Sequence, residues 1–298
     1  MAPSSERELR AELLRISHLC YERHLLVALD GNLSVRLPGG LVLCTQAGCH
    51  KGLLVDDELV VIDLEGKRVR GAGAPTSEMA MHLACYRSRP DVGAVIHAHP
   101  PLCIAFTLAG RSLARCVLPE VVLTLGTVPT LAYATTGTEL LAARVGEAML
   151  RHDAVMLDRH GAVCAGRSLR EAFCRLETME HMAAIMQAAH TLGAVRELPC
   201  DEAVKLRTLG LERYGGPPAA VARARQPGAD LPPACLTCAG CEHAPSAADT
   251  AFAAPVAAAA PRSAGRVPAA PTSAPPGLAP QGLDGEVAAA VRRVLGGG

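Results

Sequence analysis

The chain has 298 residues, and its 29 basic and 29 acidic side chains give a formal net charge of zero at pH 7. Nucleic-acid binding usually needs a basic excess, so the composition excludes it as the default function. Hydrophobic residues make up 50% of the chain and aromatic residues only 2%, so aliphatic side chains must fill the core.

The sequence contains no uncharged apolar run of about 18 residues, the length that a membrane-spanning helix needs. Its opening residues lack the apolar segment of a secretory signal. Most of the 12 cysteines stand singly within expected helices and strands, which argues against a disulfide scaffold. We therefore expect a cytoplasmic protein with reduced cysteines and no membrane partner.

Periodic apolar residues and Gly/Pro punctuation divide the first two thirds of the chain into helices and strands. Ser4 or Ser5 can serve as N-cap of the first helix. In chain order we expect a helix over 6–26, strands over 32–37, 41–45 and 59–62, a helix over 76–87, a strand over 92–99, a helix over 139–151, strands over 154–158 and 162–164, and a helix over 169–192. Strands and helices cluster rather than alternate strictly, which favours an α/β domain with an antiparallel sheet layered with helices.

The pair His97 and His99 lies in one expected strand. Residues two apart point to the same face of a strand, so both imidazoles can reach a single metal ion. Two histidines on one face are equally compatible with surface or hydrogen-bonded polar residues, and by themselves they leave that alternative open.

Glu78 and His160 complete a possible ligand set. Glu78 is expected in the first turn of the helix over 76–87, and His160 follows the strand over 154–158. One carboxylate and three imidazoles suit zinc or a similar divalent ion, and the lack of thiolates indicates a catalytic site. His82, one helical turn after Glu78, is a rival ligand, although a packing role suits it better.

An anion site is indicated by Thr76 and Ser77, because a helix N-terminus offers unpaired N–H groups and a favourable dipole. The turns at Gly31-Asn32 and at Thr45 to Gly48 can add further amides. Each segment taken alone is also compatible with an ordinary cap or turn.

Six segments together resemble the class II aldolase/adducin family, which includes fuculose-phosphate and rhamnulose-phosphate aldolases and ribulose-phosphate epimerases. They follow the family's order and spacing over about residues 6–200: Gly31 to Arg36, Thr45 to Gly48, Pro75 to Glu78 with His82, His97 to Pro100, Tyr133 to Thr138, and His160-Gly161. The resemblance implies a three-layer α/β/α domain over residues 1–215, a largely antiparallel sheet, and a homotetramer with active sites at subunit interfaces.

The same resemblance implies one zinc ion per subunit, held by His97, His99 and His160 with Glu78 as fourth ligand or acid/base. The implied reaction is retro-aldol cleavage of a ketose 1-phosphate, such as fuculose or rhamnulose phosphate, to dihydroxyacetone phosphate and lactaldehyde. The metal would stabilise an enediolate while Glu78 moves the proton, and we expect the pKa of this carboxyl to shift toward neutrality.

For the substrate phosphate, the resemblance implies a set of five binding residues: Asn32, Thr45, Gly48, Thr76 and Ser77. Ala47 stands where fuculose-phosphate aldolases have a phosphate-binding Thr, so one hydroxyl donor is missing. The aldolase segment with a catalytic Tyr is not reproduced, which leaves Tyr133 and Glu120 as the nearest candidates for protonation.

Other functions are compatible with the same residues. An epimerase, dehydratase or decarboxylase would share the metal site and differ in its acids. A non-catalytic, adducin-like interaction scaffold is the alternative from another class, although a scaffold has no need for four metal ligands.

Residues 216–282 are rich in Ala, Pro, Gly and Ser, and we expect a flexible linker there. Within the stretch 235–243 the thiols and one imidazole are spaced as in small metal-binding motifs, which makes a second metal site one interpretation: Cys235, Cys238, Cys241 and His243. The alternative is a tract of exposed thiols.

Residues 283–298 regain an apolar stripe at helical spacing, with Asp284 as N-cap and Gly296 as stop. So short a helix gains stability mainly by docking. A linker ending in such a helix resembles the encapsulation peptides of enzymes in bacterial microcompartments, which implies a shell protein as partner. The alternative is a helix that folds back onto its own domain.

Overall fold

The computed structural model describes residues 5–217. The predicted linker, the stretch 235–243 and the terminal helix over 283–298 lie outside these residues. The helices are α1 Glu6–Glu22, α2 Met79–Ser88, α3 Pro101–Leu108, α4 Pro119–Thr124, α5 Glu139–Met149, α6 Leu169–Leu192 and α7 Cys200–Tyr214. The strands are β1 Asn32–Leu37, β2 Leu41–Thr45, β3 Leu59–Asp63, β4 Arg68–Arg70, β5 Ala94–Ala98, β6 Thr130–Leu131, β7 Ala154–Leu157 and β8 Gly161–Gly166.

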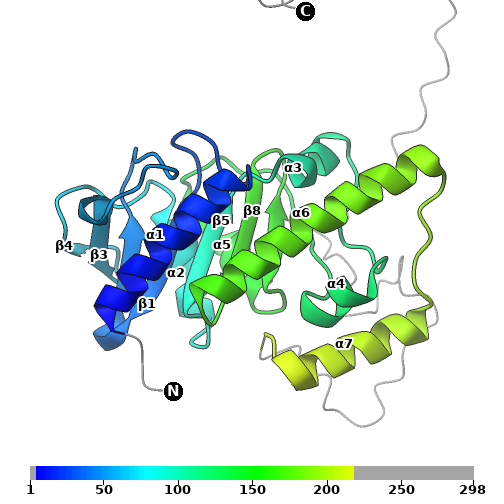
Figure 1. Ribbon diagram of the computed structural model, residues 1–298. Coiled ribbons are helices and arrows are strands. Elements are labelled where there is room, and N and C mark those ends of the chain that lie inside the picture. The colour runs from blue at the N-terminus through cyan, green and yellow to red at the C-terminus, as the bar shows by residue number, and fades with distance from the viewer. Residues whose placement is uncertain (1–4, 218–298) are drawn as a thin grey trace, which may run out of the picture. The chain divides into compact units, whose positions relative to one another are not determined.

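One eight-stranded sheet forms the middle layer, in the order β4-β3-β2-β1-β5-β8-β7-β6. Every pairing is antiparallel except the parallel pair β6 and β7. Helices α1 and α6 cover one face, and α2 and α5 lie on the other (Figure 1). The predicted three-layer α/β/α architecture with a largely antiparallel sheet is therefore confirmed.

The two faces of the sheet are both apolar because each is covered by helices. Strand β5 illustrates the alternation: Ala94 and Ile96 pack into the core beneath α1 and α6, whereas Val95 packs into the core beneath α2 and α5. His97 continues the alternation on the α2 side, where it is fully buried. The strand thus delivers a polar side chain into the layer on the α2 side.

Local sequence signals fix the ends of the helices. The Ser5 hydroxyl accepts a hydrogen bond from the Glu8 N–H, and the Glu8 carboxylate accepts one from the Ser5 N–H, which forms a capping box at the start of α1. The Thr138 and Ser168 hydroxyls likewise cap α5 and α6. Such caps satisfy backbone donors that a helix leaves unpaired.

Three predicted helices are shorter than expected, among them α5, which ends at Met149 rather than at residue 151. Helix α1 ends at Glu22 rather than at residue 26, because His24 takes a left-handed conformation and the chain turns to bury Leu25 and Leu26. Helix α2 begins at Met79 rather than at residue 76, so Glu78 is its N-cap and not a first-turn residue. The prediction missed five short or late elements: β4, α3, α4, β6 and α7.

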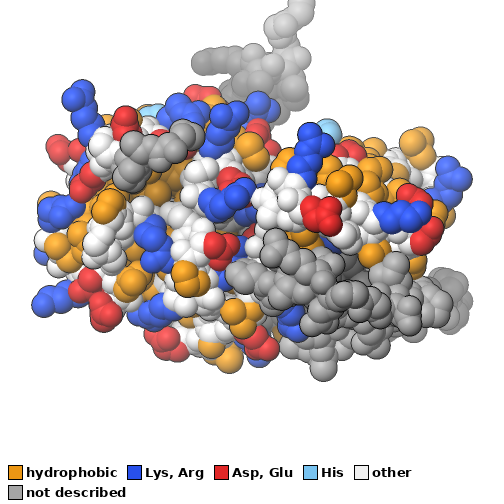
Figure 2. Space-filling model, turned by 90° about the horizontal axis from the view of Figure 1, so that it is seen from below, with side chains coloured by type: hydrophobic (Ala, Val, Ile, Leu, Met, Phe, Trp, Pro, Cys, Tyr) orange, Lys and Arg blue, Asp and Glu red, His pale blue; other side chains and the backbone are white. Residues whose placement is uncertain are grey.

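The surface carries no dominant charge on the face seen in Figure 2, where Lys and Arg side chains are interspersed with Asp and Glu. This agrees with the zero net charge of the chain. Among residues 5–217, none of the helices is long and apolar enough to cross a membrane.

At Gly31, the residue before β1, the backbone packs closely against β5, the strand that carries His97. A Cβ added at Gly31 would clash with Leu26 and lie 2.7 Å from the His97 carbonyl oxygen, whereas one added at Gly39 meets open space. Both glycines have positive φ, 67° and 77°. We expect Gly39→Ala to cost about 1–2 kcal/mol of unfolding free energy, and Gly31→Ala a further ~1–3 kcal/mol from overpacking. Urea denaturation checks this; equal losses would contradict it.

Candidate metal centre and cleft

Strand pairing assembles the histidines on the α2 side of the sheet. His97 on β5 lies opposite Asn32 on β1 and opposite Val163 on β8. His99 follows the last residue of β5, and His160 occupies the tight turn that precedes β8. Three imidazoles that are up to 63 positions apart in sequence therefore meet at one end of two neighbouring strands.

The three imidazoles point their nitrogens at a common centre. One ring nitrogen from each histidine lies within 4.8 Å of the others. The Nε2 atoms of His97 and His99 are 3.1 Å apart, and the His97 and His160 ring centroids are 4.7 Å apart. This spacing leaves room for one ion bound by all three, because zinc–nitrogen bonds of ~2.0–2.1 Å place ligand atoms a little over 3 Å from each other.

Glu78 supplies an oxygen pair to the same centre. Its Oε2 lies 3.2 Å from His97 Nε2, and its Oε1 lies 3.3 Å from His160 Nε2. Oε1 is buried and has no hydrogen-bond partner among the described residues. A buried carboxylate oxygen without a donor beside converging imidazoles fits a cation at this position.

The outer ring nitrogens show how the imidazoles are oriented. His97 Nδ1 lies 3.0 Å from the Ala162 carbonyl oxygen, a contact that requires a hydrogen on Nδ1 and leaves Nε2 free to bind a metal. His99 Nδ1 lies 3.5 Å from the Asp30 carboxylate. Both arrangements match the way metal-binding histidines are held by a carbonyl or carboxylate behind the ring.

The electrostatics keep the imidazoles of His99 and His160 neutral and the Glu78 carboxyl ionised. Burial, with His97 nearby, lowers the pKa of His160 to about 4. Burial also lowers the pKa of His99. Burial alone would raise the pKa of Glu78, but hydrogen bonding and charge from His97, Asn32 and His160 outweigh it and lower that pKa. The expected shift of Glu78 toward neutrality is thus wrong in direction, since these partners stabilise its anion.

His82 belongs to a buried hydrogen-bond chain and not to the cluster of His97, His99 and His160. Its Nε2 lies 2.6 Å from Asn32 Oδ1, and its Nδ1 lies 2.7 Å from the Ser34 hydroxyl. Asn32 Nδ2 in turn donates to Glu78 Oε2 at 2.9 Å. His82 therefore fixes the amide that holds the carboxylate, which agrees with the supporting role expected for it.

A cleft of about 330 Å³ opens beside the cluster. It is walled by the loops before α2 and after β2, which the Ala47 N–H and the Ala74 carbonyl join at 2.9 Å. Four of the five expected phosphate residues line it: Asn32, Gly48, Thr76 and Ser77. The Thr76 hydroxyl accepts a hydrogen bond from the Glu78 N–H at 3.4 Å, so the residues expected to bind phosphate directly adjoin the metal centre.

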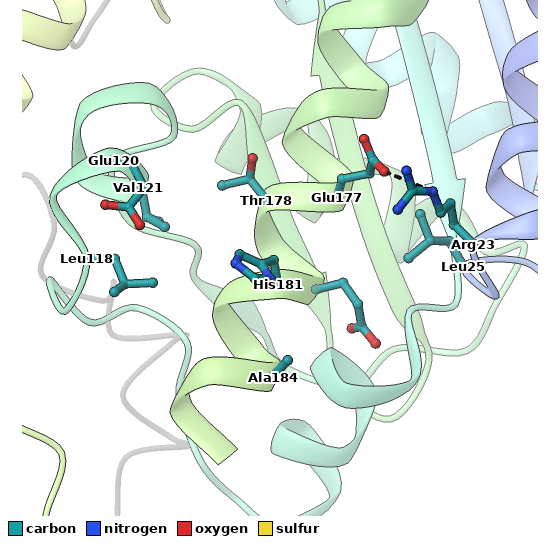
Figure 3. A pocket seen from close by; sticks show the side chains of 10 residues that line it. Arg23, Leu25, Leu118, Glu120, Val121, Glu177, Thr178, His181 and Ala184 are labelled. Carbon is teal, nitrogen blue, oxygen red and sulfur yellow. Dashed lines mark ion pairs between the residues drawn. The ribbon is translucent and has the colours of Figure 1, made fainter. Parts of the chain in front are cut away.

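Three predicted residues lie elsewhere. Thr45 is fully buried, and its hydroxyl accepts from the Leu33 N–H, so it supports the sheet under the cleft. Tyr133 is 57% exposed and is not among the cleft residues. Glu120, at the start of α4, lines a separate pocket of about 510 Å³ with Thr178 and His181 (Figure 3). Within one chain, these placements do not bring Glu120 or Tyr133 to the metal centre.

Sequence reasoning missed several residues that line the cleft: Asp30, Gln46, Lys51, Thr136 and Gly137. Asp30 directly precedes the turn at Gly31, and Gln46 lies within the turn that ends at Gly48. Thr136 and Gly137 lie in a segment that contributes to the family resemblance but has no role assigned to them. Lys51 and Asp30 carried chemical signals of their own, a cation three residues after Gly48 and a carboxylate directly before Gly31.

The buried imidazole of His82 predicts a pH dependence of stability. Burial lowers its pKa to about 3, against an ordinary value near 6.5. Between these values the unfolded chain holds a proton that the folded chain lacks, so the unfolding free energy rises with pH. In metal-free protein, His82→Gln should reduce this slope by up to ~1.4 kcal/mol per pH unit. Urea denaturation between pH 4 and 6.5 tests this; an unchanged slope would contradict it.

Comparison with known proteins shows which family the chain resembles. Residues 11–187 match the sequence model of the class II aldolase and adducin N-terminal domain. The chain is 36% identical over 172 residues to an L-fuculose phosphate aldolase of Methanococcus vannielii, covering 58% of this chain and 92% of that one. It is 32% identical over 209 residues to a 3-oxo-tetronate 4-phosphate decarboxylase of Escherichia coli, covering 68% and 97% respectively.

The fold agrees with these matches. A crystal structure of YgbL, described as a putative aldolase/epimerase/decarboxylase from Klebsiella pneumoniae, superposes with a TM-score of 0.64 at 33% identity, covering 69% of this chain and all of that one. The family match spans more than half of the chain and includes Glu78, His97, His99 and His160. The chain therefore belongs to the class II aldolase/adducin family.

Proposed function

We propose that this chain is a zinc-dependent lyase that cleaves a ketose 1-phosphate, such as fuculose or rhamnulose phosphate, to dihydroxyacetone phosphate and lactaldehyde. The observation that carries the proposal is the convergence of His97, His99 and His160 with Glu78 beside a cleft that has anion-binding loops. Its similarity to fuculose phosphate aldolases gives independent support.

The donor set fits zinc. Three neutral imidazoles and one carboxylate, with no thiolate, are typical of a catalytic zinc site. When bound, the ion supplies positive charge beside substrate oxygens that become negative as the bond breaks. The lowered pKa values of His160 and His99 keep these rings unprotonated near neutral pH, as metal ligation requires.

Glu78 is the proposed group for proton transfer. Cleavage needs a base to take the proton of the C4 hydroxyl while the C3–C4 bond breaks, and its electron pair stays on C3. A proton must then be delivered to C3 to complete dihydroxyacetone phosphate. Glu78 lines the cleft, and the Asn32 amide fixes its position. A carboxylate held between amide and imidazoles is oriented for both steps.

We propose that the phosphate binds in the part of the cleft that Asn32, Gly48, Thr76 and Ser77 line. Gly48 has φ of 71° and nothing within 4 Å of an added Cβ, so its backbone is open to the cleft. Thr76 and Ser77 precede α2, where the helix dipole favours an anion.

A decarboxylase is the second candidate. The 3-oxo-tetronate 4-phosphate decarboxylase of Escherichia coli aligns over more of this chain than the archaeal aldolase does. Loss of carbon dioxide from a 3-oxo acid, like retro-aldol cleavage, leaves an electron pair beside a carbonyl. The same metal ligands and phosphate-binding residues would therefore serve either reaction. The two reactions differ in the fragment that is released, an aldehyde or carbon dioxide.

Two further proposals rest on sequence resemblance. One is a homotetramer with sites at subunit interfaces. The other is transport into a bacterial microcompartment through residues 283–298, which would retain a volatile aldehyde. An enclosing shell would be a sensible location for an enzyme that releases lactaldehyde.

Metal content tests the ligand set. Purified full-length protein should hold about one zinc per chain, and His97→Ala with His99→Ala should abolish both zinc binding and cleavage. The matched control is His24→Ala with His181→Ala, two histidines outside the cluster. Mass spectrometry of the metal measures the outcome. A native protein that takes up no zinc would favour the adducin-like scaffold, and a double variant that keeps one zinc per chain would show that His97 and His99 are not its ligands.

Product analysis tests the reaction. With a panel of ketose 1-phosphates we expect release of dihydroxyacetone phosphate and an aldehyde in equal amounts. With 3-oxo-tetronate 4-phosphate we expect little carbon dioxide. Glu78→Gln should lower kcat by ~100-fold or more, because general acid/base catalysis is worth that much. Faster release of carbon dioxide than of aldehyde would replace the aldolase with the decarboxylase.

A further inference from the structure

Lys51 is a buried lysine in the floor of the cleft. It is only 2% exposed, yet it is among the residues that line the 330 Å³ cleft beside Gly48 and Thr76. Lysine is rarely buried unless its charge is paired. The position therefore calls for an explanation of what the ammonium group does there.

The ammonium group is held by two backbone carbonyls. Nζ donates to the Leu29 carbonyl at 2.8 Å and to the Cys49 carbonyl at 2.7 Å. The main chain of Lys51 is fixed as well, because the Ser17 hydroxyl of α1 donates to its carbonyl at 2.9 Å. The cation thus has a defined position and little freedom to swing out of the cleft.

Nζ carries three hydrogens, and the two carbonyls accept two of them, so one hydrogen remains for a further acceptor. The hydrogen bonds of Nζ go to neutral carbonyls, and among residues 5–217 the Asp30 and Glu58 carboxylates act on it through charge without forming an ion pair. Burial lowers the pKa of Lys51. An anion in the cleft would supply a third acceptor for the ammonium group.

The cleft contains no other Lys or Arg among its lining residues in the described part of the chain. Its remaining charged groups are Asp30 and Glu78, both acidic, with His99 and His160 at the metal end. Of the described lining residues, Lys51 is thus the one lysine or arginine that can balance a dianion. The alanine at position 47 offers no hydroxyl to that end.

We infer that Lys51 contacts the phosphate of the substrate directly and determines the preference for phosphorylated over neutral substrates. The inference rests on the proposed function, because it assigns a binding residue to the phosphate end of the same site. The rival explanation is structural: Lys51 ties the loop before β1 to the loop after β2 and never meets a ligand.

The test is phosphate binding by full-length, zinc-loaded protein, measured by calorimetry at constant ionic strength. Lys51→Met should weaken inorganic phosphate binding by ~10–100-fold, the value of a hydrogen bond to a charged group. Lys67→Met, the same change at an exposed lysine, should alter it by less than ~2-fold. Zinc affinity and the thermal midpoint are measured on both variants.

Loss of phosphate affinity with zinc affinity retained supports the inference. Equal loss of both, or no loss of either, overturns it in favour of the structural tie. If Lys51→Met does not fold, the ¹⁵N resonance of the Lys51 ammonium group is followed in the wild-type chain during phosphate addition. The resonance is assigned by its absence from the spectrum of Lys51→Arg. A shift on phosphate addition supports the contact, and an unmoved resonance refutes it.

The outcomes also separate this inference from the proposed function. Lys51-dependent phosphate binding without ketose cleavage would leave the contact standing and refute the aldolase. Ketose cleavage with a KM that Lys51→Met leaves unchanged would support the aldolase and refute the contact between Lys51 and the phosphate.

Discussion

The pairing of β5 with β1 and β8 determines where the three histidines of the site lie. His97 is placed by that register between Asn32 and Val163, and the two remaining histidines sit one residue beyond the paired segment or in the turn that leads into it. A shift of β5 by one residue would turn His97 toward α1 and α6. The apolar alternation along β5 prevents such a shift, because it would expose Ile96 and Val95 to the wrong cores.

The cluster is supported by a buried polar chain rather than by apolar packing alone. Tyr86, Ser34, His82, Asn32 and Glu78 follow one another through hydrogen bonds of 2.6–2.9 Å. If Asn32 donates to the carboxylate, its carbonyl accepts from His82 Nε2, and Ser34 then donates to Nδ1. Each group thereby fixes the donor role of the next, which orients the carboxylate at the metal end.

Much of this site was predictable because its chemistry lies in short segments. His97 and His99 share a strand face, and β1 and β2 have their predicted bounds, since turns with Gly and Pro delimit them. Thr45 was misplaced because strand alternation alone does not tell whether a hydroxyl faces a cleft or a neighbouring strand. Lys51 was missed because a lysine is normally exposed, and its burial depends on loops distant in sequence. Within one chain Glu120 and Tyr133 lie away from the histidines, and short segments do not reveal this separation because tertiary structure sets it.

Glu78 stands at the junction of a turn and α2, with φ of −100° and ψ of 16°, and no helical hydrogen bond depends on its side chain. A carboxylate at such a junction can rotate about its own side-chain bonds without disturbing a single turn of the helix. Ligand exchange at the metal would then require no rearrangement of the scaffold. Such a rotation would break the contacts of the carboxylate with Asn32, His97 and His160, but it would leave the helix and the three imidazoles in place.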